Sequence, residues 1–142
     1  SGIARFGKGQ PVAIVAPNNT RIAGLISQGV RVGNGILPKG QQSLDQWFRT
    51  SDFQIAPLYS LGNDSRTEPS LRGPGINVFN LSGSRNIQIM ERFRLQFRGE
   101  FFNAFNHPQF QDPVSAIVNR DFARVLSAAQ PRQVQLGLRL TF

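Results

Sequence analysis

Two segments near the C-terminus alternate between apolar or small side chains and polar ones. In residues 92–102 the first set of positions is Phe93, Leu95, Phe97, Gly99 and Phe101. In residues 132–142 the corresponding set is Val134, Leu136, Leu138, Leu140 and Phe142. Successive side chains of a β-strand point to opposite faces, so this period of two predicts strands with one dry and one wet face.

These two segments define an antiparallel β core over residues 76–142, with a terminal strand at 132–142. We predict a further strand over 76–82, with Phe79 and Leu81 on one face, and a short strand over 122–126. A turn is expected at residues 106–108, where Asn-His-Pro interrupts the pattern.

The first 75 residues are less regular. Residues 1–16 predict an N-terminal β-arm or hairpin, in which a short arm and an apolar run flank the turn residues Gly-Lys-Gly. Residues 17–75 predict a long loop region, because turn signals recur throughout it. One short helix is expected there, capped by Ser43 and presenting Leu44, Trp47 and Phe48 on its apolar face.

The predicted fold is therefore all-β. It is an antiparallel sheet, either a partial barrel or a sandwich, with one long loop and one short helix, completed by strands from neighbouring chains. Alternation over about eleven residues suits a membrane-barrel strand with lipid-facing apolar positions. It equally suits a soluble sandwich strand with one buried face, so both architectures stay open.

The amino-acid composition supports β-strands and limits the kinds of binding partner that we expect. The 142 residues amount to at most one ordinary domain, and twelve of them are Phe, which fits pleated surfaces. The net charge of +8 comes mostly from scattered Arg residues without a Lys/Arg block. We therefore expect no nucleic-acid partner, and a basic β-face that suits acidic glycans or lipid head groups.

Catalytic chemistry is not indicated. His107 is the single histidine and stands in the predicted turn, and the carboxylates are well separated along the chain. The chain has no cysteine and hence no thiolate metal site. We predict a non-enzymatic protein without cofactor or metal. Three acceptor patterns for N-glycosylation occur, at Asn18, Asn63 and Asn80.

One string of residues is distinctive. It runs Leu-Gln-Phe-Arg-Gly-Glu-Phe-Phe-Asn-Ala-Phe-Asn-His-Pro-Gln-Phe over 95–110, and Pro-Arg-Gln-Val-Gln-Leu-Gly-Leu follows at 131–138. With the terminal Phe142, it resembles the C-terminal β-barrel segment of Oar-like TonB-dependent outer-membrane receptors. The resemblance extends more weakly back to residue 1. It implies a large barrel with an internal plug and energised nutrient uptake, with Phe142 as the assembly signal.

Departures from that family point to a different function. About five or six strands are predicted, whereas even the smallest membrane barrels use about eight, and no plug is recognisable. We therefore predict a structural protein that assembles with identical subunits into an extracellular, pilus-like filament at the cell surface, since open edges recruit strands. The strand-sharing arm would present Ile3, Phe6, Val12, Ile14 and Val15 to a neighbouring subunit.

Two alternatives stay open. In one, the strands belong to the barrel of an outer-membrane TonB-dependent transporter, and only then does the chain contact the membrane. In the other, a soluble β-sandwich binds glycans through Trp47, Phe48 and Tyr59, although these aromatic side chains equally suit packing anchors for the loop.

Overall fold

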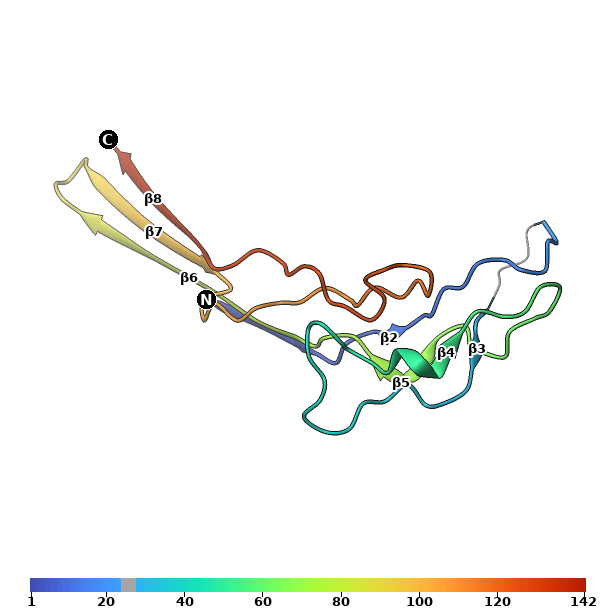
Figure 1. Cartoon of the computed structure of the whole chain (residues 1–142). Coiled ribbons are helices and arrows are strands. Elements are labelled where there is room, and N and C mark those ends of the chain that lie inside the picture. The colour runs from blue at the N-terminus through green and yellow to red at the C-terminus, as the bar shows by residue number, and fades with distance from the viewer. Residues whose placement is uncertain (24–27) are drawn as a thin grey trace. The chain divides into compact units, whose positions relative to one another are not determined.

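The computed structural model describes residues 1–23 and 28–142 and shows an all-β chain (Figure 1). The chain forms two compact units, each built from separate stretches of sequence. Unit 1 consists of Ser1–Gly7, Ile76–Gln109 and Ala128–Phe142, and unit 2 consists of Lys8–Gly75 and Phe110–Ser127. Within the described residues, no helix is long and apolar enough to cross a membrane.

Unit 1 is a four-stranded sheet in the order β1-β6-β7-β8, with every neighbouring pair antiparallel. Its strands are β1 (Gly2–Gly7), β6 (Ile76–Gln88), β7 (Arg94–Phe102) and β8 (Gln133–Thr141). The blue β1 and the red β8 in Figure 1 are therefore the two edges. The predicted strands over 92–102 and 132–142 are confirmed, as is the antiparallel all-β class.

The strand predicted over 76–82 is longer than expected, because β6 continues to Gln88. Residues 83–88 lack apolar alternation, but their backbone pairs with β7 from Gly83↔Gly99 to Gln88↔Arg94. Residues 89–93 then make a tight turn, in which the Phe93 amide donates to the Met90 carbonyl at 3.1 Å. The second half of β6 thus exists because of its partner strand rather than its own side-chain pattern.

The turn predicted at 106–108 lies three residues earlier than expected. Asn103–Phe105 form the turn, with the Asn106 amide donating to the Asn103 carbonyl at 2.7 Å. Asn103 and Asn106 both have positive φ, of 49° and 53°. Asparagine tolerates this left-handed conformation better than most residues, so the two Asn residues suit the reversal after β7.

Unit 2 contains two small antiparallel pairs and little other regular structure. β2 (Pro11–Val12) pairs with β5 (Glu68–Arg72), and β3 (Val30–Arg31) pairs with β4 (Phe53–Gln54), which follows the 3₁₀ helix η1 (Thr50–Asp52). The fully buried core residues of this unit are Val12, Ile14, Phe48, Phe53, Leu71 and Ala123. The rings of Phe48, Phe53 and Phe122 pack edge to face in this core.

The predicted hairpin over residues 1–16 is wrong. β1 pairs with β6, from Gly2↔Leu81 to Gly7↔Ile76, while β2 pairs with β5. The two halves of the stretch therefore join different units. Turn residues between two apolar runs suggested a local pairing, but each run pairs with a strand that is distant along the chain.

Two further local predictions are wrong for one shared reason. Ser43 does cap, since its Oγ accepts from the Gln46 amide at 3.2 Å, but no helix follows over 43–48. The Leu44 carbonyl accepts from the Val125 amide at 2.8 Å, and the Trp47 amide donates to the Ala123 carbonyl at 2.8 Å. These long-range bonds use groups that a helix would need. The strand predicted over 122–126 is likewise replaced by a turn, with Ala123 at φ 70°.

Candidate functional site, a sheet with two faces

The first face of the unit 1 sheet is apolar and uncovered. Paired residues point to the same side, so rows such as Leu81↔Phe101↔Val134 and Ile87↔Leu95↔Leu140 cross this face. Phe97 is 46% exposed and Leu138 is 71% exposed. Soluble monomers rarely expose a contiguous apolar surface of this kind. We therefore expect this face to be covered, either by lipid or by another protein.

The predicted β-core residues gather on this face, but they do not form a buried core. Leu95, Phe97, Phe101, Val134, Leu136, Leu138 and Leu140 share it, as their register shows. Phe93 precedes β7 in the turn, and Phe142 follows β8 and is 89% exposed. The alternation therefore predicted the correct face. The described residues do not cover this face. If the face is dry, as the alternation predicts, then lipid or another protein must cover it.

The opposite face is polar and predominantly basic. Its side chains on the three long strands include Asn86, Gln88, Arg94, Gln96, Arg98, Glu100, Gln133, Gln135, Arg139 and Thr141. Arg98 pairs with Glu100 two residues on, with Nε to Oε1 at 3.0 Å. The other arginines on these strands outnumber this single carboxylate. The sheet thus carries a wet face of the kind that lines an aqueous interior.

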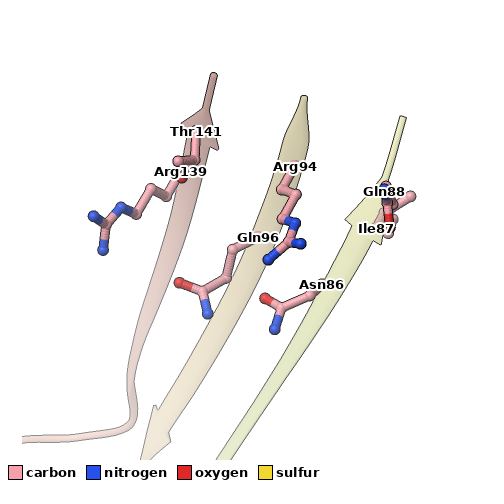
Figure 2. A pocket seen from close by; sticks show the side chains of 7 residues that line it. All are labelled: Asn86, Ile87, Gln88, Arg94, Gln96, Arg139 and Thr141. Atoms are coloured by element: carbon pink, nitrogen blue, oxygen red, sulfur yellow. The ribbon is translucent and has the colours of Figure 1, made fainter. Parts of the chain in front are cut away.

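A hollow of ≈ 470 Å³ lies on the polar face at the end next to the 89–93 turn. It is lined by side chains from β6, β7 and β8, drawn in Figure 2. The Arg94 side chain reaches toward Asn86 of the neighbouring strand, while the Arg139 side chain points away from β7 (Figure 2). With amide and guanidinium donors and no carboxylate among its lining residues, the hollow suits a negatively charged or carbonyl-rich group.

Side-chain hydrogen bonds of Asn103 and Gln109, which we call the polar clamp, stabilise the turn at the end of β7. They give these residues of the distinctive string at 95–110 a structural role. The buried Asn103 donates from Nδ2 to the His107 carbonyl at 2.9 Å and accepts the His107 amide at 3.0 Å. Gln109 exchanges two similar bonds with the backbone of Asn77 in β6. The Phe79 and Phe105 rings stack edge to face at 4.9 Å. His107 therefore has a structural place in this turn.

The residues predicted as a strand-sharing arm are divided between the two units. Ile3 and Phe6 lie on β1 and are 70% and 65% exposed, whereas Val12 and Ile14 are buried in the unit 2 core. Val15 forms a bridge with Ala116. Only β1, at the edge of the sheet, is positioned as a separate arm.

Sequence reasoning missed a buried charge cluster in unit 2. Glu68 is fully buried and forms an ion pair with Arg31, and Asp64 is buried beside it. Burial, followed by hydrogen bonding and repulsion from the Glu68 carboxyl, raises the pKa of Asp64 to about 6. Asp64 Oδ2 and Glu68 Oε1 have no hydrogen-bond partner, and a proton shared between the two carboxyls would satisfy both.

The three glycosylation candidates all use their side-chain amides in hydrogen bonds. Asn18 Nδ2 donates to the Ile22 carbonyl at 2.9 Å, and Asn63 bonds both backbone groups of Arg31. Asn80 Oδ1 accepts from the Asn103 amide at 3.0 Å. A glycan on Asn18 or Asn63 would have to displace its bond from Nδ2, so attachment stays a prediction.

The glycan-stacking platform does not form. Phe48 is 1% exposed, and the Trp47 indole packs on the unit 2 core and donates to the Arg72 carbonyl at 2.7 Å. The packing-anchor interpretation is confirmed for these two side chains. Tyr59 is exposed and has no such role.

Comparison with known families identifies the class of protein to which this two-faced sheet belongs. Residues 1–135 match a family described as an outer membrane beta barrel domain. The chain belongs to this outer-membrane β-barrel family. No curated protein and no solved structure matches it. The match supports a location at the outer membrane or the cell surface. Alternation of apolar and polar positions, as in this sheet, is typical of barrel strands, which have one face toward lipid and the other toward the lumen.

Proposed function

We propose that this sheet is part of the wall of an outer-membrane transporter of the TonB-dependent, Oar-like type, which takes up nutrients. The observation that carries the proposal is the sheet with one uncovered apolar face and one basic, polar face. A soluble sandwich would cover the apolar face with a second sheet, whereas side chains of this face such as Phe97 and Leu138 are exposed. Lipid on one side and water on the other match both faces.

Closure of the barrel needs more strands than the described sheet contains. Unit 1 has four strands, and membrane barrels use about eight or more. The edges β1 and β8 are where additional strands would pair, whether they come from the same polypeptide or from other copies. The consecutive antiparallel order of β6, β7 and β8 is the up-and-down arrangement that such a wall requires.

The connections at the two ends of the sheet differ in length. Residues 89–93 join β6 to β7 at one end, whereas Lys8–Gly75 and residues 103–132 join strands at the other. Bacterial barrels have short periplasmic turns and longer extracellular loops. We therefore assign unit 2, which is built from the two long connections, to the cell exterior, where it would meet nutrients first.

A strand-sharing filament is the second candidate, and the open edges favour it. β1 is an edge strand with exposed Ile3 and Phe6, and such a strand can leave its own sheet to complete another. In that case the apolar face would be covered by neighbouring subunits rather than by lipid. Neither candidate requires a catalytic group or a cofactor.

Native mass and detergent dependence separate the two candidates. For a transporter, the protein fractionates with outer membranes, dissolves only in detergent, and is longer than 142 residues or closes by association. Cells that lack it would lose an energy-dependent uptake activity, measured before and after a protonophore. A 142-residue chain recovered as detergent-free polymers would contradict the transporter and support the filament. Deletion of residues 1–7 should then dissolve the polymers.

A further inference from the structure

The hollow on the polar face of unit 1 contains two arginines whose charge no described residue offsets. Arg94 and Arg139 are among its lining residues, and none of these lining residues is acidic. None of the ion pairs within residues 1–23 and 28–142 includes either arginine. A hollow lined by charges of one sign raises the local concentration of ions of the opposite sign. The hollow therefore favours an anionic ligand.

The two arginines lie at opposite ends of the hollow. Arg139 of β8 is paired with Gln96 of β7, two residues along from Arg94, so the two arginines are diagonal neighbours on adjacent strands. Their side chains diverge, because that of Arg94 reaches toward Asn86 of β6 and that of Arg139 points away from β7 (Figure 2). One small ion would thus contact only one guanidinium. An elongated molecule with two separated acidic groups would contact both.

Neutral polar side chains line most of the remaining hollow. Asn86, Gln88 and Gln96 each contribute a carboxamide and Thr141 contributes a hydroxyl, while Ile87 is the one apolar lining residue. Carboxamides and hydroxyls both donate and accept hydrogen bonds, as the hydroxyls of a sugar do. The part of the ligand between its acidic groups is therefore expected to carry hydroxyl groups rather than to be an apolar chain.

We propose that the hollow binds an acidic oligosaccharide, with one carboxylate at Arg94, another at Arg139 and sugar hydroxyls at the carboxamides. Arginine forms charge-assisted, bidentate hydrogen bonds with carboxylates. The volume of ≈ 470 Å³ is within the range of ligand pockets, about 300–1,000 Å³. The role of the site rests on the proposed function: if the sheet is the wall of an uptake protein, its polar face meets the nutrient, and acidic oligosaccharides are the class of nutrient that it selects.

Calorimetric titration of the full detergent-extracted protein with trigalacturonate tests the site. Its fully methyl-esterified form, which keeps the sugar units and loses the charge, is the matched ligand control, and galacturonate carries a single carboxylate. We expect trigalacturonate to bind at least about tenfold more tightly than either. Arg94→Gln and Arg139→Gln should each lower the affinity for trigalacturonate about tenfold. Gln96→Leu should weaken binding of trigalacturonate and of its ester alike.

Arg85→Gln is the matched protein control. Arg85 is paired with Phe97 on the apolar face, so its replacement removes the same charge from the side opposite the hollow. Its affinity for trigalacturonate should equal that of the unchanged protein. Equal losses in Arg85→Gln and Arg94→Gln would show that net charge attracts the ligand and would overturn the site. So would a lack of binding to the unchanged protein, the result expected if an acidic polypeptide segment already fills the hollow.

Failure of the site and failure of the proposed function give different results. A protein that is polymeric without detergent refutes uptake, and with it the role of the hollow in selecting a nutrient. A membrane protein that needs detergent but does not distinguish trigalacturonate from its methyl ester refutes only the acidic-oligosaccharide site.

Discussion

Asn103 and His107 hold each other through two reciprocal hydrogen bonds, of 2.9 and 3.0 Å, across the turn that follows β7. Asn103 adopts a positive φ of 49°, and its own amide donates to Asn80 Oδ1 on the neighbouring strand. One buried side chain therefore supports the backbone conformation, the turn and the contact with β6 together.

Two substitutions of Asn103 distinguish the contribution of its side-chain hydrogen bonds to stability from that of its backbone conformation. Asn103→Ala should destabilise the sheet by about 2–3 kcal/mol, because it leaves the His107 amide unpaired, removes one of the two donors to the His107 carbonyl and places Ala in the left-handed region. Asn103→Gly removes the same bonds without the conformational cost, so its loss should be smaller. Urea unfolding in detergent micelles measures both. Equal stability of Asn103→Ala and the unchanged protein would contradict the clamp.

The lipid-facing assignment predicts a contrast between adjacent residues of β8. Leu136 lies on the apolar face in the row of Gly83 and Gly99, and Gln135 lies on the polar face. Leu136→Arg should cost about 2–4 kcal/mol in bilayer folding assays, the range for a lipid-facing arginine at the midplane. Gln135→Arg should cost less than about 1 kcal/mol. Similar costs for both variants would show that the apolar face does not contact lipid.

The buried carboxyl pair of unit 2 predicts a pH dependence of a definite sign. Because the pKa of Asp64 is raised to about 6 in the folded state, unit 2 binds this proton more tightly than the unfolded chain does. The contribution of Asp64 to stability is therefore most favourable below its ordinary value of 3.8. It falls as the pH rises to about 6 and stays low above that.

Asp64→Asn should remove this dependence. The Asn amide keeps the acceptor that Asp64 Oδ1 offers to Ser65 and supplies a donor to the unpaired Glu68 Oε1. We expect the variant to be more stable than the unchanged protein at pH 8, with a smaller difference at pH 4. Thermal melts of unit 2 at the two pH values measure this. A variant that is less stable at pH 8 than at pH 4, by the same margin as the unchanged protein, would refute the prediction.

The aromatic core of unit 2 predicts a large loss of stability, confined to unit 2, when one of its rings is removed. Phe48→Ala should cost about 3–5 kcal/mol, because Phe48 is 1% exposed and its ring contacts Phe53 and Phe122. Tyr59→Ala, at a position that is 73% exposed, should change stability by less than about 0.5 kcal/mol. Hydrogen exchange resolved by segment would show lost protection in unit 2. Equal losses for the two variants would contradict the burial of Phe48.

The sequence allowed prediction of the strands whose pattern is local. β7 alternates up to Phe101 and β8 alternates over its whole length, so their faces could be assigned from residues such as Leu95 and Leu138 alone. The second half of β6 could not, because Gly83 to Gln88 become a strand only by pairing with β7. The partner of β1 is equally non-local, and an adjacent turn signal pointed to a hairpin that does not form.

The site could be predicted in outline but not in its details. Alternation identified the two faces, and Arg85 interrupts the apolar one, a feature visible only once the register with Phe97 is known. The cluster of Arg31, Asp64 and Glu68 has no sequence signal, since Arg31 is distant from the two carboxyls along the chain. Long connections bring such residues together through tertiary contacts, which cannot be predicted from the spacing of the residues along the sequence.

The unequal connections at the two ends of the sheet also order its assembly in time. Pairing β6 with β7 closes only the short turn at 89–93, whereas pairing β1 with β6 must close the whole of Lys8–Gly75. By the logarithmic dependence of closure entropy on length, the second event costs about 2 kcal/mol more. We expect the β6–β7 hairpin to nucleate the sheet and β1 to join late. The edge strand β1, which is the one best placed to exchange between chains, is thus also the last strand to pair within its own sheet during folding.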